Sequence, residues 1–146
     1  MTHSPAHDMR RLLTLCEAQE ASEQRPLPPV LYHGTSPSAW RDMKYEQTMR
    51  AGDHGDGYIS FTTSAAVAER FALWAARRDG DKYGVVLTMN VPKLAADYPL
   101  EPFEDAGTHE YEAEWRIPSP DPQTGLISAE IKSIRKYVTD VEKVWA

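Results

Sequence analysis

The sequence is poor in the features that build disulfide-linked or membrane-spanning proteins. It has one cysteine, Cys16, so no disulfide can form within the chain. Its longest apolar runs, such as residues 85–87, are far shorter than the roughly 20 residues that cross a bilayer. The opening residues MTHSPAHDMRR also lack the apolar segment of a secretory signal. We therefore expect no membrane partner and a cytoplasmic location, with delivery to another cell as a secreted effector as the alternative.

Basic residues are the second shortage. Lysine and arginine together number 16 against 22 aspartates and glutamates, so the formal net charge is −6. A non-specific nucleic-acid binder needs a clustered basic surface, so this balance argues against that class and leaves only a local basic groove open. What the chain does have, 146 residues of which 41% are hydrophobic, is enough for one folded domain.

Prolines divide the chain into a short N-terminal part and one domain. Apolar residues recur at helical spacing within residues 8–24, which predicts an amphipathic helix there. The segment RPLPP follows, and its prolines end any helix. We expect residues 1–28 to form an N-terminal helix with a proline-rich linker, and residues 29–146 to form the domain.

The domain shows no internal repeat, and its predicted helices fall in its first half. Helices are predicted over 36–49 and 65–78, with Ser36 and Ser64 as their N-caps. One face of the second helix carries Val67, Phe71, Trp74 and Ala75.

Predicted strands crowd the second half of the domain. The β-prone ranges are 29–34, 58–63, 83–92, 110–118 and 127–138. Residues 93–109 are rich in proline and acidic residues, and we expect them to wrap the surface. Because helices and strands are segregated along the chain, the pattern predicts an α+β fold rather than a regular βαβ wind.

Three glutamates alternate along the segment EYEAEW. In a strand, Glu110, Glu112 and Glu114 would face one side, about 7 Å apart from one to the next. Tyr111 and Trp115 would face the other side. A solvated acidic face above an apolar one is the structural explanation, but clustered carboxylates cost stability, which favours a site that uses them.

A histidine stands at the end of the first predicted strand, in the segment LYHGTS. His33 on its own fits a hydrogen-bonded structural residue as well as a ligand-binding one. Gly34 favours a site, because a residue without a side chain lets a planar ligand approach the backbone.

The segment GYISFTTSAAVAERFA joins strand hydroxyls to the start of the second helix. Strand packing followed by an N-cap accounts for Ser64. It leaves Ser60, Thr62 and Thr63 without an explanation.

Taken together, YHGTS, ISFTTS with AERFA, and EYEAEWRIP resemble the ADP-ribosyltransferase superfamily, in its small bacterial and phage branch related to toxins. The resemblance covers residues 29–138. It implies an α+β fold of the ADP-ribosyltransferase type, a split β-sandwich with flanking helices. It also implies NAD as a substrate and no metal.

The resemblance assigns roles to the first strand. His33 matches the family histidine that holds a ribose hydroxyl of NAD. The Gly34 backbone would pair with the nicotinamide amide, and Thr35 would lie beside it.

On the second strand the sequence departs from the family pattern. The family has a tyrosine that stacks on nicotinamide about eleven residues before a second aromatic residue, which here is Phe71. Counting back from Phe71 reaches Ser60 rather than a tyrosine. Tyr58 would supply the ring if the register shifts, or Ser60 would take the serine role of the arginine-bearing branch.

The late glutamates match the Glu-x-Glu pattern of the family. Glu114 corresponds to the invariant position, whose carboxylate stabilises the oxocarbenium-like ribose formed when nicotinamide leaves. Glu112 would orient or deprotonate the acceptor.

These matches imply a mono-ADP-ribosyltransferase, as a toxin or phage effector, acting on an unknown protein, nucleic acid or small molecule. An inhibitor or antitoxin protein would be its partner. An NAD glycohydrolase and a non-catalytic module that binds NAD, ADP-ribose or a protein are the alternatives. An RNA 2′-phosphotransferase is disfavoured because its later arginines and histidine are not found. A metal hydrolase built on His54 and His109 is disfavoured because their spacing fits no compact ligand motif.

Overall fold

A computed structural model describes residues 26–52, 57–103, 114–121, 123–124 and 126–146. The predicted N-terminal helix within residues 8–24 lies outside the described residues. So do Glu110, Glu112, His54 and His109. The boundary between an N-terminal segment and a domain at residue 29 stays a prediction.

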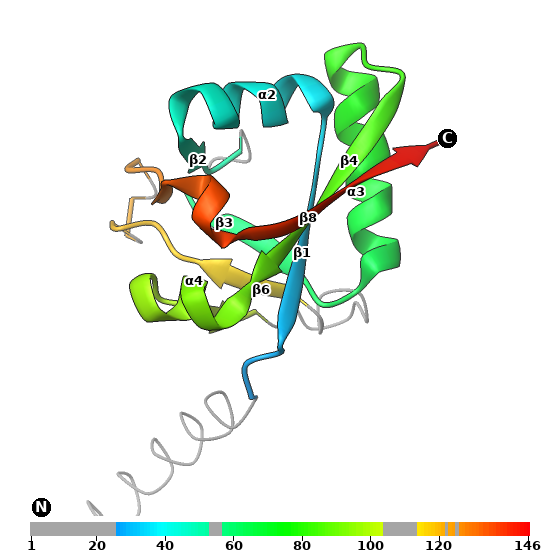
Figure 1. Cartoon of the computed structure of the whole chain (residues 1–146). Coiled ribbons are helices and arrows are strands. Elements are labelled where there is room, and N and C mark those ends of the chain that lie inside the picture. The colour runs from blue at the N-terminus through cyan, green and yellow to red at the C-terminus, as the bar shows by residue number, and fades with distance from the viewer. Residues whose placement is uncertain (1–25, 53–56, 104–113, 122, 125) are drawn as a thin grey trace, which may run out of the picture.

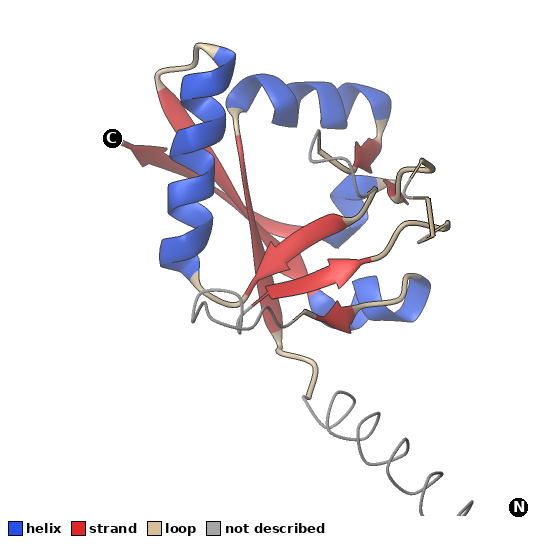
Figure 2. Ribbon diagram, turned by 180° about the vertical axis from the view of Figure 1, so that it is seen from behind, coloured by secondary structure: helices blue, strands red, loops and turns tan. Residues whose placement is uncertain are grey.

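The described chain forms a six-stranded antiparallel sheet and a two-stranded one (Figures 1 and 2). The strand order in the large sheet is β5-β6-β3-β1-β4-β8. Its strands are β1 (Val30–Thr35), β3 (Ile59–Thr62), β4 (Tyr83–Asn90), β5 (Glu101–Pro102), β6 (Glu114–Ile117) and β8 (Val138–Trp145). The small sheet pairs β2 (Thr48–Arg50) with β7 (Glu130–Lys132). This antiparallel arrangement with separate helices is α+β, as the sequence predicted.

The large sheet consists of two halves that meet at one position. Within the described residues, β1 and β3 pair only at Tyr32 and Thr62. By contrast, β1 pairs with β4 along its whole length, and β3 pairs with β6 along its whole length. In Figure 1, β6 accordingly runs at a steep angle to β1. The half made of β5, β6 and β3 therefore turns away from the half made of β1, β4 and β8.

Two serines begin the longer helices, as predicted. Helix α2 (Pro37–Glu46) is capped by Ser36, whose Oγ accepts a hydrogen bond from the Ala39 amide. Helix α3 (Ala65–Asp79) is capped in the same way by Ser64.

The prediction that the first helix extends to residue 49 is wrong. Gln47 adopts a left-handed conformation with φ 59°, which ends α2. The next three residues then form β2 against β7.

Helix α3 lies very close to the sheet, and small residues make this possible. Its buried positions are all alanines: Ala68, Ala72, Ala75 and Ala76. On the sheet side the helix meets glycines, because a Cβ on Gly84 would lie 2.5 Å from the Ala72 carbonyl carbon. The larger residues of the predicted face point elsewhere: Phe71 and Trp74 are more than half exposed.

The main core lies on the opposite face of the sheet from α3. Sheet residues such as Leu31, Phe61 and Leu87 pack there against Trp40 of α2 and Ile134. In Figure 1, α3 stands on one side of the strands while α4 and β2 stand on the other. The sheet is thus covered on both faces, by alanines on one side and by bulky side chains on the other.

Two elements correct the predicted chain path near the middle of the domain. The strand predicted over 83–92 ends at Asn90, whose side chain caps helix α4 (Val91–Asp97) through the Lys93 amide. The expected surface excursion over 93–109 therefore begins with a helix that buries Val91 and Leu94.

The C-terminal part also differs from the prediction of one strand over 127–138. Ser133, with φ 54°, separates β7 from a 3-10 turn, η2 (Ile134–Tyr137). The chain then continues as β8, which pairs with β4. Of the strand predicted over 110–118, the described residues form β6 up to Ile117, and Pro118 lies beyond its end. In the described part of the chain, no helix combines the length and the apolar character that crossing a membrane requires.

Candidate functional site

A cavity of about 600 Å³ opens where the two halves of the sheet diverge. Its volume lies within the range of ligand sites in proteins. The walls come from β1, β3, β6, α2, α3 and β2. Most of the residues singled out from the sequence line it: His33, Gly34, Thr35, Tyr58, Ser60, Phe71 and Glu114. Segments 81 positions apart in the sequence, at His33 and Glu114, therefore meet at one site.

The His33 imidazole is held by the backbone of the neighbouring strand. Its Nδ1 lies 2.9 Å from the carbonyl oxygen of Ser60. A carbonyl oxygen can only accept, so Nδ1 carries a proton and donates it to Ser60. The ring also contacts Phe61, with 5.7 Å between the ring centroids. These contacts fix the orientation of the imidazole at the cavity wall.

Gly34 is required by packing. A Cβ at this position would lie 2.2 Å from the Ala68 carbonyl oxygen and 2.6 Å from the Ala72 amide nitrogen. The space that the glycine leaves is therefore filled by α3 and not reserved for a ligand. Its backbone nevertheless lines the cavity, and Thr35 beside it is buried at the same wall.

The two alternatives for the second strand both face the cavity, in different settings. Ser60 lies in β3, opposite Arg116 in the register with β6. The Tyr58 ring has one face covered by the Arg116 guanidinium, 3.6 Å from the ring centroid. A planar ligand would therefore meet Tyr58 at its other face or its edge.

Phe71 and Trp74 form an aromatic wall on α3. Both side chains line the cavity, and they are 55% and 59% exposed. Arg78, one turn further, lies over the Trp74 ring at 5.2 Å. In the sequence, Trp74 is marked only as part of a helix face, and Arg78 is not predicted in the site. The signal available was their spacing from Phe71, which places all three together on the helix.

Glu114 places its carboxylate in a nearly dry setting. The residue is 8% exposed, and it faces Thr62 across the β3–β6 pair. A buried carboxylate is tolerated when it has a charged, hydrogen-bonded partner. That partner is Arg116, whose Nε donates to Glu114 Oε2 at 2.5 Å. Trp115, between them in sequence, enters the core on the other face, so the predicted alternation holds for the described residues.

Arg116 was not identified from the sequence. Its guanidinium lies between the rings of Tyr58 and Phe103, at 3.6 and 3.3 Å from their centroids. The signal available in the sequence was its position two residues after Glu114, on the same face of a strand.

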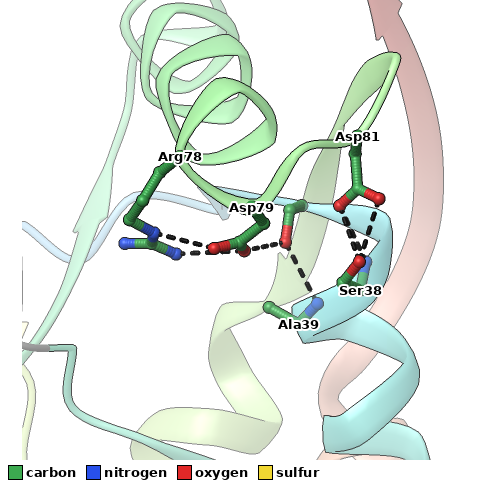
Figure 3. Close-up of polar contacts among 6 residues, drawn as sticks. Ser38, Ala39, Arg78, Asp79 and Asp81 are labelled. Atoms are coloured by element: carbon green, nitrogen blue, oxygen red, sulfur yellow. Dashed lines mark hydrogen bonds and ion pairs between the residues drawn. The ribbon is translucent and has the colours of Figure 1, made fainter.

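A polar network joins the two helices that border the cavity (Figure 3). Ser36 donates from Oγ to Asp79 at 2.5 Å, and Arg78 donates from Nε to the same carboxylate at 3.0 Å. Ser38 binds Asp81 through both its amide and its hydroxyl. The hydrogen bonds from Arg78 and then Ser36 lower the pKa of Asp79. The network fixes the start of α2 against the end of α3.

No metal site is found among the residues that the structure describes, since no three of their histidine, cysteine, aspartate or glutamate side chains gather. Among the described residues of the cavity, His33, Glu114 and the hydroxyls of Thr35 and Ser60 are groups of the kinds that bind and polarise an organic substrate.

No protein-family model matches the sequence, and no curated protein matches it. Evidence for a function therefore comes from the residues and their arrangement.

Proposed function

We propose that the protein is an NAD-dependent mono-ADP-ribosyltransferase. The observation that carries the proposal is that His33 and Glu114, from segments far apart in the sequence, line one cavity. Hydroxyls and aromatic rings of the kinds expected beside a dinucleotide line the same cavity.

The fold gives the proposal further support. The sheet divides at Tyr32 and Thr62 into two halves that diverge. An ADP-ribosyltransferase-like split β-sandwich, in which NAD binds between the halves, fits this arrangement. The cavity lies at that division.

The chemistry proposed for Glu114 is electrostatic. When the bond between the ribose C1′ and the nicotinamide nitrogen breaks, its electron pair leaves with nicotinamide and positive charge develops on the ribose. The Glu114 carboxylate accepts a hydrogen bond from the ribose 2′-hydroxyl and stabilises that charge in a water-poor site. An acceptor then attacks C1′ and loses a proton.

His33 and the residues beside it would hold the substrate. With Nδ1 held at the Ser60 carbonyl, the imidazole is oriented at the cavity wall, where it would contact a ribose hydroxyl. Thr35 and Ser60 supply hydroxyls at the same wall. The backbone of Gly34 would pair with the nicotinamide amide.

The aromatic wall of α3 suits the two rings of NAD. Phe71 would stack on one ring and Trp74 on the other, with the cationic Arg78 beside Trp74 near the phosphates. Cavity-lining positions on α3 run from Val67 to Arg78. Eleven helical steps cover about 16 Å, so this wall is long enough to contact more than one part of a dinucleotide.

Glu112 keeps its proposed role toward the acceptor, although it lies outside the described residues. The acceptor, a role as a toxin or phage effector, and an inhibitor protein stay proposals that follow from the resemblance.

Mass spectrometry tests the proposal. Lysate proteins and nucleic acids are treated with the protein and NAD, and the added mass of ADP-ribose is sought, with Glu114→Gln as the matched control. Modification by the wild type but not by Glu114→Gln supports the proposal.

The same samples without lysate separate the alternatives. Rapid nicotinamide release without an acceptor indicates an NAD glycohydrolase. Calorimetric binding of NAD without release under any condition indicates a binding module.

A further inference from the structure

We propose that Arg116 is a positioning residue that sets the orientation of the Glu114 carboxylate. The inference rests on the proposed function and adds a residue that the resemblance does not assign.

The Glu114 and Arg116 side chains are neighbours because of the geometry of the strand. They stand two positions apart on β6, so both project from the same face of the strand. Nε of Arg116 donates to Oε2 of Glu114 at 2.5 Å, and their side chains are 20% and 10% exposed. A charge-assisted hydrogen bond with so little contact with water restricts the rotation of the carboxylate.

The guanidinium is itself held on both faces. Tyr58 lies against one face and Phe103 against the other, with centroid distances of 3.6 and 3.3 Å. A flat, delocalised cation can be clamped between two rings in this way, whereas a lysine ammonium cannot. The two aromatic rings therefore fix the position of the Arg116 guanidinium, and the guanidinium in turn fixes the carboxylate.

The consequence concerns the two oxygens of Glu114. Oε2 receives the hydrogen bond from Arg116. This leaves Oε1 to accept the ribose 2′-hydroxyl in a fixed direction. Because catalysis by a carboxylate depends on placement within a fraction of an ångström, the loss of this support is expected to slow the chemical step more than it weakens NAD binding.

A direct contact between Arg116 and a phosphate of NAD is the competing role. It predicts a rise in KM with kcat preserved, because such a contact acts equally on bound substrate and transition state. The ratio of the two effects therefore separates positioning from substrate binding.

Steady-state nicotinamide release in the presence of lysate acceptors is measured for the wild type, Arg116→Lys, Arg116→Ala and Glu114→Gln. Arg41→Ala is the matched control, because Arg41 is an exposed arginine on α2 that does not line the cavity. We expect Arg116→Ala to lower kcat by about 100-fold and to change KM by less than about threefold. Arg116→Lys keeps the paired charge but not the planar fork, and we expect a loss of about tenfold in kcat.

Chemical rescue gives a readout that a purely structural role would not move. Guanidinium chloride at millimolar concentration should restore part of the kcat of Arg116→Ala, by occupying the space between Tyr58 and Phe103. Sodium chloride at the same ionic strength should not, and guanidinium should not restore Glu114→Gln. If Arg116→Ala does not fold, the kcat and KM of Arg116→Lys distinguish positioning from substrate binding.

Failure of this inference is distinguishable from failure of the proposed function. A wild type that releases no nicotinamide overturns both. An active wild type with unchanged kcat in the arginine variants, or with a rise confined to KM, overturns the role of Arg116 alone.

Discussion

Gly34 of β1 lies against the backbone of Ala68 in α3 so closely that a Cβ on the glycine would be 2.2 Å from the Ala68 carbonyl oxygen. Real Cβ atoms do not approach an oxygen so closely, and a backbone oxygen in the middle of a helix cannot move aside alone. This contact fixes the distance between α3 and the sheet. It thereby fixes where Phe71 and Trp74 stand along the cavity.

Gly34→Ala should therefore destabilise the fold. We expect a loss of about 3 kcal/mol in the free energy of unfolding, measured by urea denaturation, because the helix must shift to make room. Gly80→Ala is the control, since its added Cβ meets nothing within 4 Å and its cost of about 1 kcal/mol comes only from the left-handed backbone. Equal losses in the two variants would show that steric contact with α3 is not the cause.

Trp74→Ala should weaken NAD binding without unfolding the protein. The side chain is 59% exposed, so its removal leaves no large cavity in the core. We expect KM for NAD to rise about tenfold, in line with the 1–3 kcal/mol typical of stacking between a base and an aromatic side chain. Tyr45→Ala removes another exposed aromatic residue, on α2 and away from the cavity, and should leave KM unchanged. A Trp74 variant with the KM of the wild type would remove this ring from the binding site.

How far the sequence alone predicted the fold depends on the kind of signal. Ser36 and Ser64 were recognisable as N-caps because capping is local in sequence. Asn90 with Pro92 two residues later carries the same local signal for α4, but the preceding run is so β-prone that it predicts a strand up to residue 92 and a surface excursion after it. Strand β8 was missed because an edge strand with mostly exposed residues shows little apolar alternation.

The site was predicted only in part, for a geometric reason. The resemblance brought His33 and Glu114 together, and the structure places both on one cavity. The outward position of Trp74 depends on the glycines of β1 and β4 against which α3 packs, so no pattern within α3 could reveal it. The contact of Arg116 with two aromatic rings requires Phe103, and Phe103 lies next to β6 because β5 pairs with β6.

Ser36→Ala should loosen the junction of α2 and α3. The Ser36 hydroxyl caps α2 and also donates to Asp79, so we expect a loss of about 1–2 kcal/mol in the free energy of unfolding at pH 7. Urea denaturation measures it. Ser38→Ala, which removes the hydroxyl bound to Asp81 but no cap, should cost less. A larger loss for Ser38→Ala would contradict the role given to Ser36.

The Asp79 carboxylate should make stability depend on acid. Its pKa is lowered in the folded protein by Arg78 and Ser36, so its contribution is present above the unfolded pKa and is lost as pH falls through the folded pKa. The difference in unfolding free energy between the wild type and Asp79→Asn should therefore be larger at pH 7 than at pH 2.5. A constant difference across this range would show that the ionised carboxylate contributes nothing.

Tyr137 should make stability depend on alkali. Its hydroxyl donates to Asp97 at 2.5 Å, and this bond raises the pKa of Tyr137 to about 12. A raised pKa means that the stabilisation is complete below the unfolded value near 10 and is lost as pH rises toward about 12. The wild type should lose more unfolding free energy between pH 9 and 11 than Tyr137→Phe does. Tyr45→Phe, which removes an exposed hydroxyl, controls for the substitution itself.

The most direct measurement is nicotinamide release from NAD by the wild type and by Glu114→Gln, monitored by chromatography in the presence of lysate acceptors and compared with release in their absence. Glutamine keeps the shape of the side chain and its Oε1 can accept the hydrogen bond from Arg116, so the variant should fold, with an unfolding midpoint lowered by the loss of the ion pair. We predict release by the wild type and a rate lower by about 100-fold or more in the variant. Equal rates in the two proteins, or no release by the wild type with any acceptor, would contradict the account.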